Sequence, residues 1–237
     1  MVIQWDLEPT KHLAEVATDS LLAPARRTEP IVVLTEGRTD TRILSRSLEK
    51  LYPHLAHLYT FLNHEGFGPQ PGTGGVGNLY KGLADCRISN RVIAPFDNDA
   101  AGTVATKVRP FPANFLALQL LALELARNYP TIGPTGPVNT DINSLACGIE
   151  LYLGTASLSK SDGTLTPIQW TGFERQLEKY QGELRDKEKV QEHYLQRLEA
   201  TTNVQDDPQF EDMRMLFRKI FQAFGGAIPS HAARPQA

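Results

Sequence analysis

Three carboxylates in this sequence have the spacing of a site for a divalent cation. Asp97 and Asp99 stand one residue apart directly after the apolar run 91–96 (RVIAPF), and Glu36 follows the apolar run 31–35 (IVVLT). Carboxylates held close together repel one another unless a cation offsets their charge. Ligation by oxygen atoms alone favours Mg²⁺ or Mn²⁺ over Zn²⁺. If the two apolar runs form neighbouring strands, the sequence predicts a Mg²⁺ or Mn²⁺ site.

Each motif has a simpler interpretation when it is taken alone. The segment 97–99 (DND) fits a turn at a strand end followed by a helix N-cap, because Asp and Asn are common in both. Glu36 with Gly37 fits an ordinary solvated turn. Together the motifs favour the cation site, since ligands bind outside the carboxyl ends of the strands in open α/β sheets.

The elements that must position these carboxylates alternate between strand and helix. The run 31–35 is apolar and β-branched on both faces, which is typical of a parallel strand covered by helices on both sides. The pattern predicts strands over 31–35, 57–62, 91–96 and 114–118, and helices over 40–52, 78–86 and 100–108. A Gly- and Pro-rich segment, 63–77, is interpreted as a mobile loop. This alternation predicts an α/β fold with an open, mainly parallel sheet flanked by helices.

The second half of the chain follows a different pattern. Turn-forming residues crowd the segment 129–140, and a helix is expected over 144–153. A hairpin turn at 161–163 precedes an expected strand over 164–170. Two helices, 184–200 and 211–224, close the chain. The expected parts are a lead-in (1–30), an α/β core (31–142), a mostly helical C-terminal extension with a short hairpin (143–226) and a disordered tail (227–237).

Composition limits the classes of protein to consider. The 237 residues are 41% hydrophobic and 22% charged, with a net charge of −3, which excludes a wholly basic nucleic-acid coat but not a local basic patch. The two cysteines, Cys86 and Cys147, match no metal or disulfide framework. No apolar run reaches about 18 residues, and the N-terminus lacks the pattern of a signal segment. We therefore expect a cytoplasmic protein.

The two acidic motifs resemble those of the Toprim family, the module shared by topoisomerases, bacterial primases and several nucleases. The segment 34–40 (LTEGRTD) resembles the family's strand, Glu-Gly and later Asp. The segment 96–102 (FDNDAAG) resembles its Asp-x-Asp-x-x-Gly motif and follows about 60 residues later, in the family's order. The resemblance covers about residues 31–120 and implies the Toprim fold.

Further segments resemble the C-terminal part of bacterial HEPN/Toprim-associated proteins, and the Toprim part resembles, more distantly, overcoming-lysogenization-defect nucleases. These segments are 96–99, 129–134, 148–153, 167–170 and 180–183. The resemblance implies a nuclease in anti-phage defence that works with a partner protein. Topoisomerase and primase activities are disfavoured, because those enzymes need further domains.

The resemblance also implies a role for each matched residue. Asp97 and Asp99 would hold Mg²⁺ or Mn²⁺, and Glu36 would be a metal ligand or the general acid/base. In the nuclease branch a downstream acid supports a second ion, for which Glu150 is the candidate and Asp141 the reserve. A lysine that contacts phosphate is expected at one of two positions, Lys187 or Lys189. The simpler interpretation of these downstream residues is a solvated, charged helix surface.

A basic rim beside the acidic site would serve to bind a nucleic acid. Arg38, Arg42 and Arg46 share the first helix, and Lys81 and Lys107 could add to the rim. Solvated surface residues are the alternative interpretation. The prediction is therefore a Mg²⁺- or Mn²⁺-dependent endonuclease, with one or two ions, that hydrolyses or nicks DNA. The alternatives are an RNA-cleaving enzyme of the same family and a non-catalytic Toprim module that binds DNA or a partner.

Overall fold

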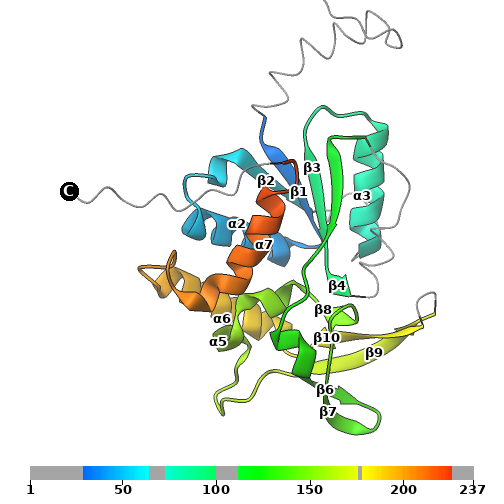
Figure 1. Ribbon diagram of the computed structural model, residues 1–237, viewed down its shortest axis with the longest axis vertical. Coiled ribbons are helices and arrows are strands. Elements are labelled where there is room, and N and C mark those ends of the chain that lie inside the picture. The colour runs from blue at the N-terminus through cyan, green and yellow to red at the C-terminus, as the bar shows by residue number, and fades with distance from the viewer. Residues whose placement is uncertain (1–28, 64–72, 100–111, 176–177, 226–237) are drawn as a thin grey trace, which may run out of the picture.

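The computed structural model describes residues 29–63, 73–99, 112–175 and 178–225, which form two four-stranded sheets and one two-stranded sheet. Figure 1 shows helices packed around the sheets. The expected helix over 100–108, the disordered tail and nearly all of the lead-in lie outside the described residues. None of the helices in the described ranges is long and apolar enough to cross a membrane.

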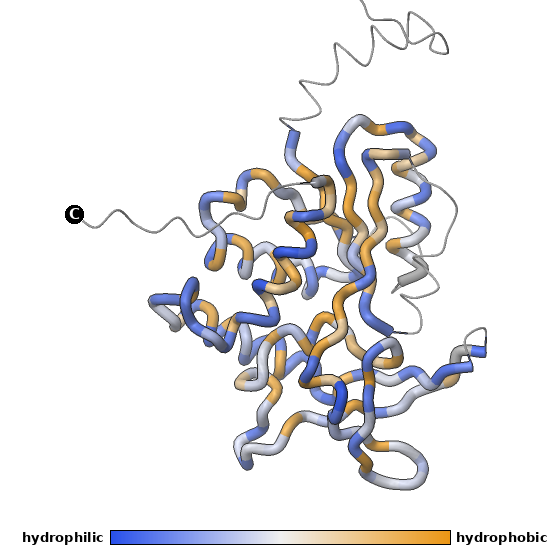
Figure 2. The backbone as a smooth tube through the Cα atoms, in the orientation of Figure 1, coloured by the Kyte–Doolittle hydropathy of each residue, from blue (hydrophilic) through white to orange (hydrophobic). Residues whose placement is uncertain are grey.

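The first sheet contains four parallel strands. They are β1 (Ile31–Thr35), β2 (Tyr59–Asn63), β3 (Val92–Phe96) and β5 (Phe115–Gln119), in the order β2-β1-β3-β5. Every neighbouring pair in this order is parallel. The expected α/β fold with a parallel sheet flanked by helices is therefore confirmed. Figure 2 shows that the strands of this sheet are predominantly apolar, as burial on both faces requires.

Helices cover both faces of the first sheet. Val33 and Ile93 belong to the same apolar cluster as the inner face of α2 (Arg38–Leu51). Leu34 and Ala94, which point to the opposite face, pack in a second cluster with α3 (Thr73–Asp85). Figure 1 shows α2 on one side of the sheet and α3 on the other.

Helix α3 begins inside the segment that the sequence had predicted to be a loop. The expectation of a loop over 63–77 is wrong for residues 73–77, which form the first turns of α3. Glycine lowers helix propensity by only about 1 kcal/mol per residue. Val76, which is fully buried against the sheet, offsets that loss through its packing.

The second sheet takes strands from both sides of residue 142. It contains β6 (Tyr129–Gly133), β7 (Gly136–Thr140), β9 (Ile168–Glu174) and β10 (Lys179–Leu184), in the order β10-β9-β6-β7. The segment 129–140, predicted to be turn-rich, is in fact the β6–β7 hairpin. Its turn residues are confined to 134–135, while Tyr129 and Thr131 alternate inward and are fully buried. The turn expected at 161–163 is present, but it closes only a single antiparallel bridge between Ser159 and Leu165. The β9–β10 hairpin, which lies further along the chain, was not predicted.

The helix expected over 144–153 is replaced by shorter elements. Strand β8 (Ala146–Cys147) pairs with β4 (Asn98–Asp99), and a 3-10 helix, η3 (Ile149–Leu153), leads into α5 (Thr155–Leu158). Ser144 has φ of 60°, which interrupts a right-handed helix at its expected start. Pairing with β4, a contact distant in sequence, overrides the helical spacing of the apolar residues.

The last helices pack against α2, so the C-terminal part shares a core with the first sheet. These helices are α6 (Lys187–Ala200) and α7 (Glu211–Phe221), joined through a short 3-10 turn, η4 (Pro208–Phe210). The Tyr194 hydroxyl of α6 lies 2.7 Å from Ser47 Oγ of α2, and both side chains are buried. Tyr52, at the end of α2, packs edge-on against Phe217 and Phe221 of α7. These contacts hold α6 and α7 against α2.

Candidate active site

The carboxyl ends of β1 and β3 meet at the point where the strand order of the first sheet reverses. From β1 the chain continues outward to β2 and then returns to β3 on the other side of β1. A crevice opens at such a switch point, because the connections leave the two strands in opposite directions. β1 pairs directly with β3, so the expectation that these two strands are neighbours is confirmed. Glu36 follows β1, and Asp97 follows β3.

A cleft of about 470 Å³ lies at this edge of the sheet. Its lining combines the loop after β1, the start of α2, the strand-end motif at 97–99, η3, the β9–β10 hairpin and the start of α6. Acidic side chains dominate the lining: Glu36, Asp40, Asp97, Asp99, Glu150, Glu183 and Glu188. Arg38 and Lys187 are the basic residues of the lining. The cleft is therefore strongly negative unless cations enter it.

The start of α2 places Asp40 beside Glu36. Gly37 is the N-cap of the helix, and its backbone N–H donates to Asp40 Oδ2 over 3.2 Å. This is half of a capping box, which is favourable because it satisfies an otherwise free N–H at the helix start. Asp40 belongs to the motif 34–40, but the motif alone does not identify it as a site residue. The capping-box spacing from Gly37 was the available signal.

Pairing between β4 and β8 directs Asp97 and Asp99 into the cleft. Asn98, between them, is buried; its amide donates to Asn143 Oδ1 over 3.4 Å, and its carbonyl oxygen accepts from Ser144 Oγ over 3.2 Å. Successive side chains of a strand point to opposite sides, so both aspartates lie on the side away from these bonds. The cation-site interpretation of this motif requires that arrangement.

Glu150 and Asp97 both lie beside Gly148. A Cβ atom at Gly148 would lie 2.8 Å from Glu150 Oε2 and 3.1 Å from Asp97 Oδ2, so no other residue fits without moving a carboxylate. The other oxygen of Glu150 accepts a hydrogen bond of 2.9 Å from Gln191 Nε2 of α6. Glu150 therefore lies in the cleft, where the sequence had predicted a second acidic group.

Burial and mutual repulsion raise the pKa values of the central carboxylates. Burial raises the pKa of Asp97 well above its usual range, and the charges of Glu36, Glu150 and Asp99 raise it further. Burial, followed by the charges of Glu150 and Glu36, raises the pKa of Asp40 to about 7. Burial also raises the pKa of Glu150, against the opposing effects of Lys187 and the Gln191 hydrogen bond. A bound cation would relieve all three carboxylates at once.

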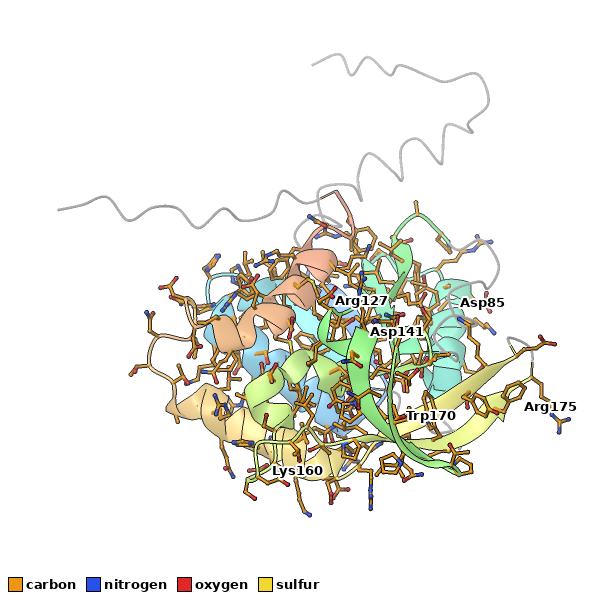
Figure 3. All side chains as sticks on the ribbon, turned by 60° about the horizontal axis from the view of Figure 1, so that its bottom comes forward. Asp85, Arg127, Asp141, Lys160, Trp170 and Arg175 are labelled. Atoms are coloured by element: carbon orange, nitrogen blue, oxygen red, sulfur yellow. The ribbon has the colours of Figure 1, made fainter. Side chains whose placement is uncertain are left out.

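Of the two candidate lysines, Lys187 lines the cleft and Lys189 does not. Lys187 Nζ lies 3.8 Å from Glu183 Oε2 at the rim. Lys189 is exposed and pairs with Asp186 over 2.9 Å. Asp141, labelled in Figure 3, is exposed after β7, where its carboxylate accepts a bond from the Asn143 backbone; it is not part of the lining.

Of the expected basic rim, Arg38 lies at the cleft. Arg42 faces Glu192 of α6 at 3.8 Å, and Arg46 pairs with Glu49 at 3.0 Å. Lys81 belongs to α3, on the other face of the sheet, and Lys107 lies outside the described residues. The β9–β10 hairpin extends from the cleft wall, and Figure 3 shows Arg175 at its outer end.

The donor set of the cleft fits a hard divalent cation. Within the described part of the chain, the lining contains Asp and Glu but no His or Cys, so its potential ligands are carboxylate oxygens, which Mg²⁺ and Mn²⁺ prefer. In the side-chain conformations of the described residues, no three His, Cys, Asp or Glu side chains converge closely enough to hold a metal ion. Binding a cation therefore requires rotation of carboxylates that already line the same space.

Gly148 and Gln191 were not found by sequence reasoning. Gly148 precedes Glu150 by two residues, but its role depends on the position of Asp97. Gln191 carries no sequence signal, since its contact depends on how α6 packs. Searches of protein-family models, curated proteins and solved structures find no match to this chain.

Proposed function

We propose that this protein is a Toprim-type nuclease that uses Mg²⁺ or Mn²⁺ to hydrolyse or nick phosphodiester bonds in DNA. One observation carries the proposal: carboxylates from three separate segments, 36–40, 97–99 and 150, line one cleft at the switch point of a parallel sheet. Such a cluster is unfavourable unless a cation offsets its charge. The placement of the Glu-Gly and Asp-x-Asp motifs after adjacent parallel strands supports the Toprim assignment.

Three carboxylates are the best candidates to hold the cation, namely Glu36, Asp97 and Asp99, with Asp40 and Glu150 beside them. A divalent cation bound there would lower the pKa of a coordinated water and stabilise charge on the phosphoryl oxygens. Both effects are what phosphodiester hydrolysis needs, because the P–O bond to the leaving group breaks as the bond to water oxygen forms.

The cleft also contains groups suited to proton transfer and phosphate binding. The pKa of Asp40 is about 7 in the cleft without a cation, and a bound cation would lower it. Asp40 would then be ionised at neutral pH, as a general base requires. Glu36, next to it, is the acid/base that the family resemblance implies. Lys187, at the start of α6, brings a positive charge to the cleft and can contact a phosphate oxygen.

Conversion of supercoiled plasmid, in Mg²⁺, Mn²⁺ or EDTA, tests the proposal. We expect nicked or linear product that depends on the metal, and a loss of at least about 100-fold in Asp97→Asn and Glu36→Gln. Asp141→Asn, which removes an exposed carboxylate outside the cleft, serves as the matched control. An RNA of the same sequence, tested in parallel, distinguishes DNA from RNA as substrate. Cleavage that persists in EDTA or in Asp97→Asn would refute the proposal.

A further inference from the structure

Gln191 is a buried polar residue whose contact in the cleft has no role in the mechanism outlined above. Its side chain is 6% exposed, yet it lines the cleft from α6. A buried amide must find hydrogen-bond partners. Its Nε2–H donates to Glu150 Oε1 over 2.9 Å. The carboxylate of Glu150 is thus held by one of its two oxygens.

The other oxygen of Glu150 lies beside Gly148, close enough to Asp97 for the charge of Glu150 to raise the pKa of Asp97. Glu150 Oε2 and Asp97 Oδ2 both lie close to Gly148, at 2.8 Å and 3.1 Å from where its Cβ would be. A Glu side chain has three rotatable bonds and would otherwise turn away from a second carboxylate, because like charges repel. The hydrogen bond from Gln191 opposes that movement.

Helix α6 is itself held in place by α2, so Gln191 is a fixed donor. The hydroxyl of Tyr194, three residues along α6, lies 2.7 Å from Ser47 Oγ of α2. Lys50 of α2 pairs with Glu199 of α6 over 2.8 Å. The same α2 begins just after Gly37, its N-cap, and next to Asp40 and Glu36, which line the cleft. The Gln191 bond therefore connects Glu150 to the helices that carry the other half of the site.

We propose that Gln191 is a positioning residue, which orients Glu150 so that Oε2 faces Asp97 and the two carboxylates can bind a divalent cation together. The inference rests on the proposed function, because it concerns the cation that the nuclease reaction needs. Residues that orient metal ligands in this way typically change metal affinity by about 10- to 100-fold when they are replaced.

Binding of Mn²⁺ to the full chain, measured by calorimetry without nucleic acid, tests this role. Gln191→Met keeps the length of the side chain and removes the donor, so we expect affinity for Mn²⁺ to fall about tenfold. Gln191→Asn, which keeps the amide but is one methylene too short to reach, should show the same loss. Gln196→Met is the matched control, because Gln196 makes the same type of bond, to Glu192 over 3.3 Å, on the exposed side of α6.

A double-mutant cycle separates positioning from a general effect on folding. If Gln191 acts through Glu150, Gln191→Met should cause no further loss of Mn²⁺ affinity in a Glu150→Gln background. An equal loss in both backgrounds, or wild-type affinity in both Gln191 variants, would overturn the inference and leave the nuclease proposal standing. A wild-type chain that binds Mn²⁺ no better than Asp97→Asn would overturn the proposed function, and this inference with it.

Discussion

Replacing Asp40 by Asn should stabilise the metal-free protein at alkaline pH. Burial and the charges of Glu150 and Glu36 raise the pKa of Asp40 to about 7, from 3.8. Below about pH 4 the carboxyl is protonated in both the folded and the unfolded state, so it has no effect on stability. Between about pH 4 and pH 7 the unfolded chain loses this proton first, and the free energy of unfolding falls. Above about pH 7 the loss is complete.

The size of the effect follows from the pKa difference. A shift of about three units corresponds to about 4 kcal/mol at pH 8. Because water reaches the cleft and screens these charges, we expect about half of this, or about 2 kcal/mol. For a chain of this size that corresponds to a rise in Tm of about 4–8 °C. The amide oxygen of Asn can still accept the 3.2 Å bond from the Gly37 N–H, so the helix cap is retained.

Thermal unfolding in EDTA from pH 4 to pH 8, followed by circular dichroism, measures the effect. The Tm of Asp40→Asn should match wild type at pH 4 and exceed it increasingly up to pH 8. Asp206→Asn, an exposed carboxylate far from the cleft in sequence, should leave Tm unchanged at every pH. A Tm difference that does not vary with pH, or a variant less stable than wild type at pH 8, would refute the reasoning.

Three further predictions concern the same cleft. Gly148→Ala should reduce cleavage at least about tenfold, because its Cβ would separate the carboxylates of Glu150 and Asp97; activity at the wild-type level would show that their approach is not needed. Lys187→Met should lower kcat/KM for plasmid nicking by about tenfold or more, whereas Lys189→Met, outside the cleft, should not; equal effects would argue against a phosphate contact. Mn²⁺ at 100 times its Kd should stabilise wild type by about 2.7 kcal/mol at pH 8 and leave Asp97→Asn unchanged, as judged from Tm; equal stabilisation would place the ion elsewhere.

The sequence determined the first sheet and the acidic ends of its strands. The runs that became β1 and β3 are apolar and bounded by turn residues, so their burial and direction follow from local composition. Glu36 and Asp97 come directly after those strands, and parallel strands place their carboxyl ends at one edge. Part of the site could therefore be predicted without knowledge of the packing.

Local pattern failed where a distant partner decides the structure. The apolar residues Leu145, Ile149 and Leu153 have helical spacing, yet β8 forms there because Asn98 and Asp99 provide a strand to pair with. The residues of β6 and β7 appeared to be turns because Gly and Pro are frequent among them, yet the hairpin is stabilised by pairing with β9. In both cases pairing between distant segments outweighs local propensity.

The second half of the site was decided by tertiary structure. Glu150 could be identified as a candidate, but its approach to Asp97 depends on Gly148 and on the β4–β8 pairing. Its orientation depends on Gln191, which the packing of α6 against α2 brings to it from about 40 residues away. A sequence specifies which carboxylates follow its strands, because that is a local property. Which side chains then share a buried cleft depends on how the helices pack, and no spacing along the chain encodes that.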